Sequence, residues 1–421
     1  MSWTTLAQYR HHPGLRVYAE GWQSWSPATW YDSRLAGHRP GEAWQHLMRF
    51  RPGVALAPDG VQGEGLLAVD TGGQAVAYGA VDPTGSVPTI RARHRGDVVV
   101  IQADGPVEAY RGGDGIAALR AWGHHVADPI RRDRPAPRVW CTWYRFFEAI
   151  TASDVVRNAR RIRDIGLGID VIQIDDGWAA GAGERFAPRA GMPDLPAVID
   201  EVRGLGFEAG IWLAPWIAAA ASPLVSANPS IVTGPAGINW GTDQVGLDPT
   251  AAAVQELVEG VVTRLAGMGV SYFKLDFLYA GALARPGEPR EAGIRRYRSA
   301  LAGIRRAAGP GAYLVGCGAP LLPSLGLVDA MRVSPDVFHE ADQTGAAGLR
   351  GRLSALGRGW QNSVLWSADP DCLVLRPSYL QRMPWAEVVA GYGGLVSWSD
   401  EVDELDDRGI EVLREILDRD S

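Results

Sequence analysis

The chain has 421 residues, of which 46% are apolar, and its 41 Lys plus Arg against 48 Asp plus Glu give a net charge of −7. A chain of this length and apolar content can bury a large core, as is typical of a globular protein. The composition excludes an intrinsically disordered chain and a basic nucleic-acid-binding domain, so we expect no nucleic acid as a partner.

The first part of the chain, residues 1–130, is predicted to form a small β-rich domain. Short β-like runs at 65–69, 74–80 and 97–103 are separated by Gly, Pro and Asp turn signals, which is typical of antiparallel strands. The segment RRDRPAPR at 131–138 is rich in proline and charge and is typical of a linker. We therefore expect a second domain at 131–421.

From residue 138 onward, apolar strand candidates alternate with helical patterns. In 251–268 the residues Val254, Val258 and Leu265 fall on one helical face, and 153–165 repeats the pattern. Eight strand candidates lie at 139–144, 170–175, 208–214, 271–277, 312–317, 330–334, 363–367 and 394–399. Strands that are buried on both faces and alternate with helices predict a (β/α)₈ TIM barrel, although the connection 318–329 is too short for a full helix.

Carboxylates recur where these strand candidates end. In a TIM barrel the active site lies at the carboxyl ends of the strands, so these side chains are candidates for catalysis or binding. They are Asp175, Asp176, Asp276, Asp336, Asp369, Asp371 and Asp400.

The only lysine of the chain, Lys274, lies two residues before Asp276 within an apolar run. Because side chains alternate along a strand, Lys274 and Asp276 share one face, and we expect both to point into the barrel mouth. A nearby cation lowers the pKa of a carboxyl group, which would keep Asp276 ionised as a nucleophile.

A structural role is the competing explanation for each acid. A single Asp at a strand end is more often a helix cap or a turn residue, and Asp369 and Asp371 beside Pro370 fit that interpretation. The Lys274 and Asp276 pair is harder to explain in this way, because buried charges are costly unless they are paired or used in function.

Other chemistries find little support in the sequence. The eight histidines form no HExxH motif or ligand cluster, and neither a GxSxG elbow nor a phosphate-binding glycine loop is present. We therefore expect no metal. Most of the 16 tryptophans should be core, but those near candidate strand ends or loops, such as Trp22, Trp25 and Trp212, could face a sugar.

The three cysteines, Cys141, Cys317 and Cys372, lie far apart and form no CxxC pair, so a reducing compartment suits them. The N-terminus lacks the apolar stretch of a signal peptide, and no window approaches the roughly 20 apolar residues of a membrane span. The sequence thus predicts a cytoplasmic protein without a membrane partner.

Six motifs in series resemble the strand-end motifs of the family 36 glycoside hydrolases, the melibiase-type α-galactosidases, which are related to family 27. They are DDGW (175–178), GIWLAP (210–215), FKLDF (273–277), GCGAPL (316–321), MRVSPD (331–336) and DPDCLVLR (369–376). The resemblance covers residues 140–400 in the right order. GWQSWSP at 21–27 is also similar to a segment of the family's N-terminal domain that reaches toward the active site.

This resemblance implies a role for each matching residue. Asp276 would be the nucleophile and Asp336 the general acid/base, an assignment that the residues alone do not give. Contacts to the sugar would come from Asp175, Asp176, Trp212, Lys274, Cys317 and Arg332, with Trp22 and Trp25 contributed by the N-terminal segment.

The implied reaction is retaining hydrolysis of terminal α-galactosides without a cofactor. Two alternatives stay open: a galactosyl transferase of the raffinose-synthase kind, in which a sugar replaces water, and a sugar-binding protein without catalysis. The chain departs from the family in its short N-terminal part and in having only 22 residues after Ser399. Assembly into a homo-oligomer and the preference for long or branched substrates stay open for that reason. The sequence also leaves open the preferred aglycone and whether the glycone is galactose, N-acetylgalactosamine or arabinopyranose.

Overall fold

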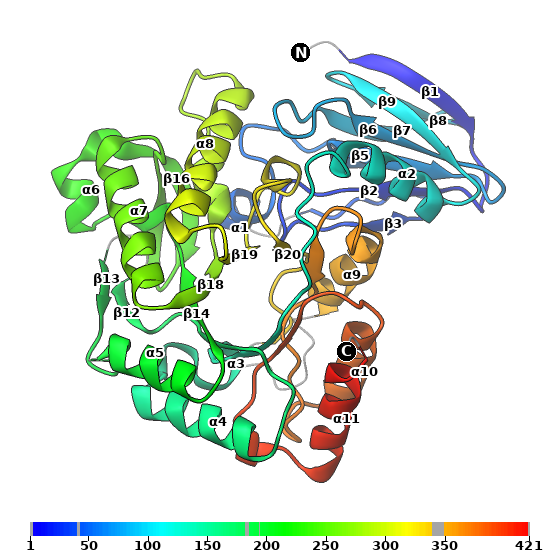
Figure 1. Cartoon of the computed structure of the whole chain (residues 1–421). Coiled ribbons are helices and arrows are strands. Elements are labelled where there is room, and N and C mark those ends of the chain that lie inside the picture. The colour runs from blue at the N-terminus through cyan, green and yellow to red at the C-terminus, as the bar shows by residue number, and fades with distance from the viewer. Residues whose placement is uncertain (1–2, 40–42, 182–184, 193, 339–348, 420–421) are drawn as a thin grey trace.

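A computed structural model describes residues 3–39, 43–181, 185–192, 194–338 and 349–419. The larger part of the fold is a TIM barrel, and the N-terminal residues form antiparallel sheets beside it (Figure 1).

The barrel is built from eight parallel strands in the order β21-β20-β19-β18-β14-β11-β10-β22. Their bounds are β10 Arg138–Cys141, β11 Val171–Ile174, β14 Glu208–Leu213, β18 Val270–Leu275, β19 Tyr313–Gly316, β20 Ala330–Arg332, β21 Ser367–Asp369 and β22 Val396–Trp398. The seam between β21 and β22 is bridged by the amide of Leu395 donating to the carbonyl of Ala368 at 3.0 Å, and by a parallel bridge between Leu373 and Trp398. The predicted TIM barrel is therefore confirmed.

Helices cover the outside of the barrel and explain why its strands are apolar on both faces. The helices are α4 Ala152–Asp164, α5 Leu195–Gly204, α7 Ala252–Gly267, α8 Arg290–Ala308, α9 Leu349–Arg358, α10 Arg382–Ala390 and α11 Asp407–Leu417. Helix α4 begins with a capping box in which Thr151 and Asp154 satisfy each other's backbone amides. The helices expected at 153–165 and 251–268 correspond to α4 and α7.

Two antiparallel sheets form the N-terminal part, in the orders β1-β8-β7-β4 and β3-β2-β5-β6-β9. The strands are β1 Thr4–Arg10, β2 Arg16–Ala19, β3 Thr29–Tyr31, β4 Val61–Glu64, β5 Leu66–Asp70, β6 Ala75–Ala80, β7 Thr89–Arg95, β8 Val98–Ala103 and β9 Val107–Gly112. Alternate side chains such as Leu67 and Ile101 fill a core between the sheets, whereas Leu66 and Ala68 on the other face join the main core of the molecule.

Two helices that the sequence did not predict complete this part of the chain. Helix α2 (Gly115–Ala127) packs Trp122 onto β6, where the indole would overlap any side chain at Gly79. Helix α1 (Ala43–Arg49) lies against β16 (Val232–Asn239), a strand inserted between β14 and β18. The insertion places α1 beside the barrel mouth.

One predicted barrel strand is displaced. The candidate at 363–367 contributes only Ser367, because β21 runs from Ser367 to Asp369. The apolar run before it forms turns, in which the amides of Val364 and Leu365 donate to the carbonyl of Gln361. A short buried apolar run does not by itself distinguish a strand from a packed turn.

Short inserted elements complete the barrel connections: α3 Trp143–Phe146, β12 Ala179–Gly181, β13 Arg185–Pro188, β15 Ile217–Ala219, α6 Pro223–Ala227 and β17 Thr242–Leu247. Among the described residues, no helix is long and apolar enough to cross a membrane.

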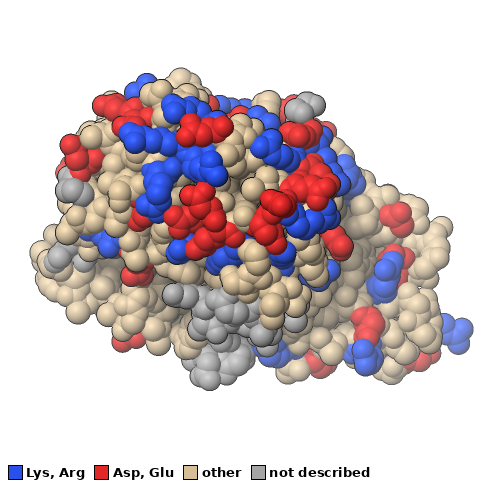
Figure 2. Space-filling model, turned by 90° about the horizontal axis from the view of Figure 1, so that it is seen from below, with Lys and Arg blue, Asp and Glu red and all other residues tan. Residues whose placement is uncertain are grey.

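Helices α4, α5 and α11 lie along the lower edge of Figure 1, and Figure 2 views the molecule from below. Basic and acidic side chains are intermingled on that face, and ion pairs join Arg160 to Glu201 at 2.6 Å and Arg161 to Asp403 at 2.8 Å. Exposed pairs of this kind each contribute about 0–1 kcal/mol to stability.

Candidate active site

The carboxylates that the sequence placed at three separate strand ends lie around one cavity. Asp175 follows β11, Asp276 follows β18 and Asp336 lies four residues beyond β20. The cavity has a volume of about 290 Å³. It is lined by Trp25, Trp44, Met48, Arg49, Trp143, Asp175, Asp176, Trp212, Ile238, Asn239, Trp240, Lys274, Asp276, Phe277, Pro335 and Asp336.

Asp276 lies where the chain turns sharply out of β18. Its amide still continues the sheet by donating to Leu213, but the next residue, Phe277, has φ 52°, a left-handed conformation that is uncommon for a side chain of this size. The Phe277 amide then donates to the Asp276 carboxylate at 2.8 Å. Backbone strain of this kind is often found at functional sites, where it holds a side chain in one direction.

The Asp276 carboxylate is buried and accepts hydrogen bonds from protein donors. The indole Nε1 of Trp212 donates to it at 3.1 Å, and the Cys317 thiol also contacts it. Burial raises the pKa of Asp276, and the charge of Lys274 and these hydrogen bonds offset that rise only in part. The predicted lowering of this pKa is therefore wrong, because desolvation outweighs the nearby cation.

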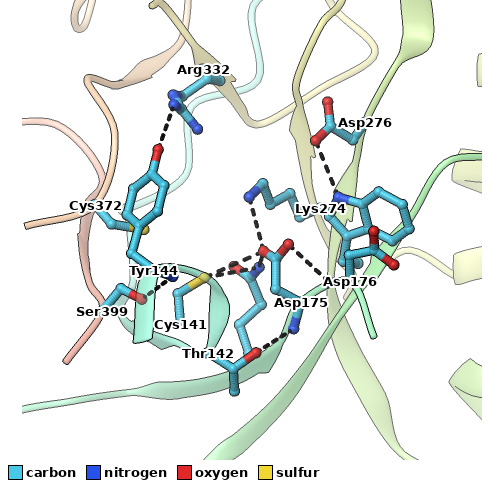
Figure 3. A network of polar contacts seen from close by, with 12 residues as sticks. Cys141, Thr142, Tyr144, Asp175, Asp176, Lys274, Asp276, Arg332, Cys372 and Ser399 are labelled. Carbon is cyan, nitrogen blue, oxygen red and sulfur yellow. Dashed lines mark hydrogen bonds and ion pairs between the residues drawn. The ribbon is translucent and has the colours of Figure 1, made fainter. Parts of the chain in front are cut away.

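Lys274 points into the barrel as predicted, but its ion-pair partner is Asp175. The Nζ atom lies 2.9 Å from Asp175 Oδ2, and both side chains are buried (Figure 3). Burial works to lower the pKa of Lys274, but Asp175 prevails and holds it well above its ordinary value. Asp175 also accepts from Gln173 Nε2 at 2.5 Å and from the Cys141 thiol at 3.3 Å.

Asp176, the second acid of the DDGW motif, is held at the cavity edge by a residue that the sequence analysis did not identify. The indole of Trp240 donates to its carboxylate at 2.8 Å. Burial raises the pKa of Asp176 to about 6, against the opposing effect of that hydrogen bond. Trp240 lies in the turn between β16 and β17 with φ 49°, and no local motif marks it as a site residue.

Arg332 bridges two carboxylates on the far side of the cavity. Its Nη2 lies 3.0 Å from Asp336 Oδ1 and 2.5 Å from Asp371 Oδ2. The hydroxyl of Tyr144 donates to Asp371 at 2.5 Å. The same hydroxyl lies 3.5 Å from Arg332 (Figure 3). Burial raises the pKa of Asp371, while Arg332 works to lower it.

Asp371 is one of the candidate acids for which the sequence left a turn as the competing explanation. It does sit in a turn, since its amide donates to Asp369 at 2.9 Å and its φ is 109°. However, it is also buried against the guanidinium that contacts Asp336. The DPD sequence predicts the turn, but it does not predict the ion pair between Asp371 and Arg332.

The structure brings most of the predicted site residues together and separates one. Cys317 and Arg332 lie behind the cavity wall, where they contact Asp276 and Asp336. Trp25 lines the cavity, with its ring 5.0 Å from that of Phe277. Trp22 does not line it: this indole is buried under the Arg51 guanidinium, 4.5 Å away.

The aromatic rings form one wall of the cavity. The ring of Trp240 lies between two others, with its centroid 6.4 Å from that of Trp212 and 4.9 Å from that of Phe277. Flat apolar faces beside carboxylates suit a sugar, which has an apolar C–H face and a polar rim of hydroxyls. Among the described residues, no three His, Cys, Asp or Glu side chains are grouped to hold a metal ion.

A scan against known protein families finds no match for this chain. The solved structures do contain similar proteins. The α-galactosidase TtGalA from Thermus thermophilus, in complex with p-nitrophenyl α-D-galactopyranoside, is 29% identical over 99% of this chain and 89% of its own length, with a TM-score of 0.83. Its complex with stachyose gives a TM-score of 0.82.

A more distant similarity extends to the family 36 enzymes by name. The GH36 α-galactosidase AgaA from Geobacillus stearothermophilus aligns with 97% of this chain at a TM-score of 0.65, but with 13% identity, so it supports the fold alone. This chain covers 61% of AgaA. The resemblance to α-galactosidases that the six strand-end motifs indicated is therefore confirmed by similar solved structures.

Proposed function

We propose that this protein is a retaining glycoside hydrolase that releases terminal α-linked galactose from α-galactosides. The observation that carries the proposal is that Asp276 and Asp336, from different strand ends, face the same cavity. The motifs around them match those of α-galactosidases, and the similar TtGalA was crystallised with α-galactosides.

In the proposed reaction, Asp276 attacks the anomeric carbon while Asp336 donates a proton to the departing glycosidic oxygen. The sugar is then held as a β-galactosyl ester of Asp276. Asp336, now ionised, takes a proton from a water molecule whose oxygen attacks the same carbon and releases Asp276. The α configuration is thereby retained, and no cofactor enters either step.

The geometry of the site fits these two roles. Asp276 must be ionised in order to attack, and Lys274, Trp212 and the Phe277 amide favour that ionised form against the burial that raises its pKa. Asp336 is more exposed than Asp276, with 37% of its side chain accessible, and can therefore exchange protons with water during turnover. Its contact with Arg332 fixes the direction of the carboxyl group.

The remaining polar groups are proposed to bind the sugar. Asp175, Asp176 and Lys274 present charged groups that can hydrogen-bond galactose hydroxyls, and Trp25 and Trp212 present apolar faces. We further propose that residues 1–130 act as a domain supplying the Trp25 wall to a catalytic domain at 131–421. The three buried, unpaired cysteines fit a cytoplasmic location.

The test is the stereochemistry of azide rescue. In Asp276→Gly, azide should fill the vacated space and attack an activated aryl α-galactoside directly, which gives the inverted β-galactosyl azide. In Asp336→Ala, azide should intercept the galactosyl-enzyme and give the α-galactosyl azide. Both products can be identified by NMR.

Substrate choice provides the control for this experiment. Asp336→Ala should lose on the order of 10²–10⁴ in rate on alkyl galactosides, which need a protonated leaving group, and much less on the activated aryl galactoside. If the two azide products have the opposite configurations, then the roles of Asp276 and Asp336 are exchanged. A sucrose acceptor added to wild-type enzyme would reveal a transferase if galactosyl sucrose formed faster than free galactose.

A further inference from the structure

Arg358, the last residue of α9, is fully buried, and all five of its N–H groups have partners. Nε donates to Glu20 Oε1 at 2.8 Å. Nη1 donates to the carbonyls of Ser24 and Val333, both at 2.8 Å. Nη2 donates to the carbonyls of Gln23 and Ser26 at 3.3 and 3.0 Å.

Glu20, the carboxylate partner of Arg358, is also fully buried and satisfied at both oxygens. Oε1 accepts the amide of Gly21 in addition to Arg358, and Oε2 accepts Tyr18 and Gln361, each at 2.6 Å. A buried ion pair of this kind adds little net stability, whereas the loss of one partner leaves an uncompensated charge that costs about 3–5 kcal/mol. The pair is therefore better explained by what it holds in place.

On one side, Arg358 holds residues 21–26, which close around its guanidinium. The turn is so tight that a side chain at Gly21 would overlap Ser26 Cβ, 2.1 Å away. This segment also pairs with the loop after β19, where Ser24 and Ala319 exchange hydrogen bonds at 3.1 Å. It carries Trp25 into the cavity wall.

The same segment holds the other N-terminal residues of that wall. Gln23 Nε2 donates to the carbonyl of Met48, and the Ser26 hydroxyl donates to the carbonyl of Arg49. Met48 and Arg49 belong to α1 and line the cavity. The N-terminal wall of the site thus depends on the backbone turn that Arg358 fills.

On its other side, Arg358 holds the loop that carries Asp336. Val333, whose carbonyl accepts from Nη1, is the first residue after β20 and lies three residues before Asp336. The loop is fixed again one residue later, where the Ser334 hydroxyl donates to the carbonyl of Pro370. A single guanidinium therefore links two walls that come from opposite ends of the sequence.

We propose that Arg358 is a positioning residue that sets the distance between the Trp25 wall and the Asp336 loop. It touches no substrate, and the inference rests on the proposed role of Asp336 as general acid. A guanidinium is required because its planar fork serves five acceptors at fixed angles, whereas the ammonium of lysine offers three donors from one point. Misplacement of a catalytic group by about 1 Å can cost about 10²-fold in rate.

The experiment compares Arg358→Lys with Arg305→Lys. Arg305 has similar partners at the opposite end of the barrel, where it donates to Asp329 at 2.6 Å and to the carbonyls of Leu327 and Ala312. For each variant, kcat/KM is measured on methyl α-galactoside and on p-nitrophenyl α-galactoside, together with Tm. We expect Arg358→Lys to lose about tenfold or more beyond Arg305→Lys on the methyl substrate, with a smaller loss on the aryl substrate.

A purely structural role would lower Tm and reduce activity on both substrates in equal proportion in both variants, and that result overturns the proposal. If Arg358→Lys does not fold, Glu20→Gln carries the same comparison, because it keeps the guanidinium and removes its charge partner. Hydrogen exchange gives an independent readout: amides in 21–26 and 333–337 should exchange faster in Arg358→Lys and not in Arg305→Lys. If wild-type enzyme hydrolyses neither galactoside, the proposed function fails, and unchanged exchange in those segments would refute the linkage itself.

Discussion

At the amino ends of the barrel strands, Asp329 is fully buried and lies 2.7 Å from Arg132 and 2.6 Å from Arg305. It also accepts the amide of Leu314 at 2.8 Å. At the carboxyl ends, the buried acids around the cavity include Asp175, Asp276 and Asp371, and the cations beside them are Lys274 and Arg332. Carboxylates therefore outnumber cations at the carboxyl ends of the strands. At the amino ends, by contrast, Asp329 is paired with two arginines.

The pKa values follow the same division. Burial works to raise the pKa of Asp170, at the amino end, but hydrogen bonds from the side chain and amide of Arg138 prevail and lower it. Burial raises the pKa values of Asp176 and Asp276 at the carboxyl end, and their partners do not compensate. A surplus of partly compensated acids in a cavity is expected of a site that binds or transforms a ligand, whereas full compensation is expected of a structural pair.

The largest contrast should come from removing one acid at each end. Asp276→Asn removes the proposed nucleophile and should lower kcat/KM on p-nitrophenyl α-galactoside on the order of 10⁴-fold or more, with little change in Tm. Asp170→Asn removes the partner of Arg138, so it should lower Tm and leave kcat/KM nearly unchanged. Steady-state kinetics and thermal unfolding of both variants test this prediction, and a large activity loss in Asp170→Asn would abolish the distinction between the ends.

A second contrast concerns the cations. Lys274→Arg should fold normally but lose on the order of 10²–10³ in kcat/KM, because a guanidinium cannot occupy the space of the ammonium beside Asp175 and the cavity. Lys274→Met should be worse, since it leaves Asp175 buried without its partner. Arg132→Lys, at the amino end, keeps a cation beside Asp329 and should retain activity. If Lys274→Arg keeps wild-type kinetics, the site does not require an ammonium at this position and the prediction is wrong.

Local sequence patterns predicted the barrel and the direction of its polar side chains, because strand periodicity is a local property. The parity that places Lys274 and Asp276 on one face is confirmed by the cavity that both residues line. The ion-pair partner of Lys274 could not be predicted in this way. Asp175 follows β11, and β11 and β18 are separated by β14, so their contact crosses the barrel interior and depends on its closure.

Site residues that come from inserted segments could not be predicted either, because their position depends on tertiary contacts and not on local sequence patterns. Trp240 lies in an inserted hairpin and Met48 in a helix of the N-terminal part, and neither carries a motif. Trp22 was predicted together with Trp25 because both lie in the segment GWQSWSP, but within this tight turn the two side chains point in different directions. The tertiary path of the chain, which composition does not encode, decides which of the two reaches the cavity.

The smallest expected effect is a difference in the sign of pH dependence between the two ends. The pKa of Asp176 rises from 3.8 to about 6 on folding, so between pH 4 and 6 the native state binds more protons than the unfolded state, and the free energy of unfolding falls as pH rises. The shift corresponds to at most about 3 kcal/mol, and water in the cavity should reduce this to about 1–2 kcal/mol. Asp176→Asn should therefore be more stable relative to wild type at pH 7 than at pH 4.

Asp170 should behave in the opposite way, because its folded pKa is lowered. Its contribution to stability is present above the unfolded pKa and is lost as pH falls through the folded pKa. Asp170→Asn should consequently be less stable relative to wild type at pH 7 than at pH 3, as measured by urea unfolding. If the stability of both variants relative to wild type changes with pH in the same direction, the pKa values of the acids at the two ends of the barrel are shifted in the same direction. The surplus of carboxylates around the cavity would then not indicate function.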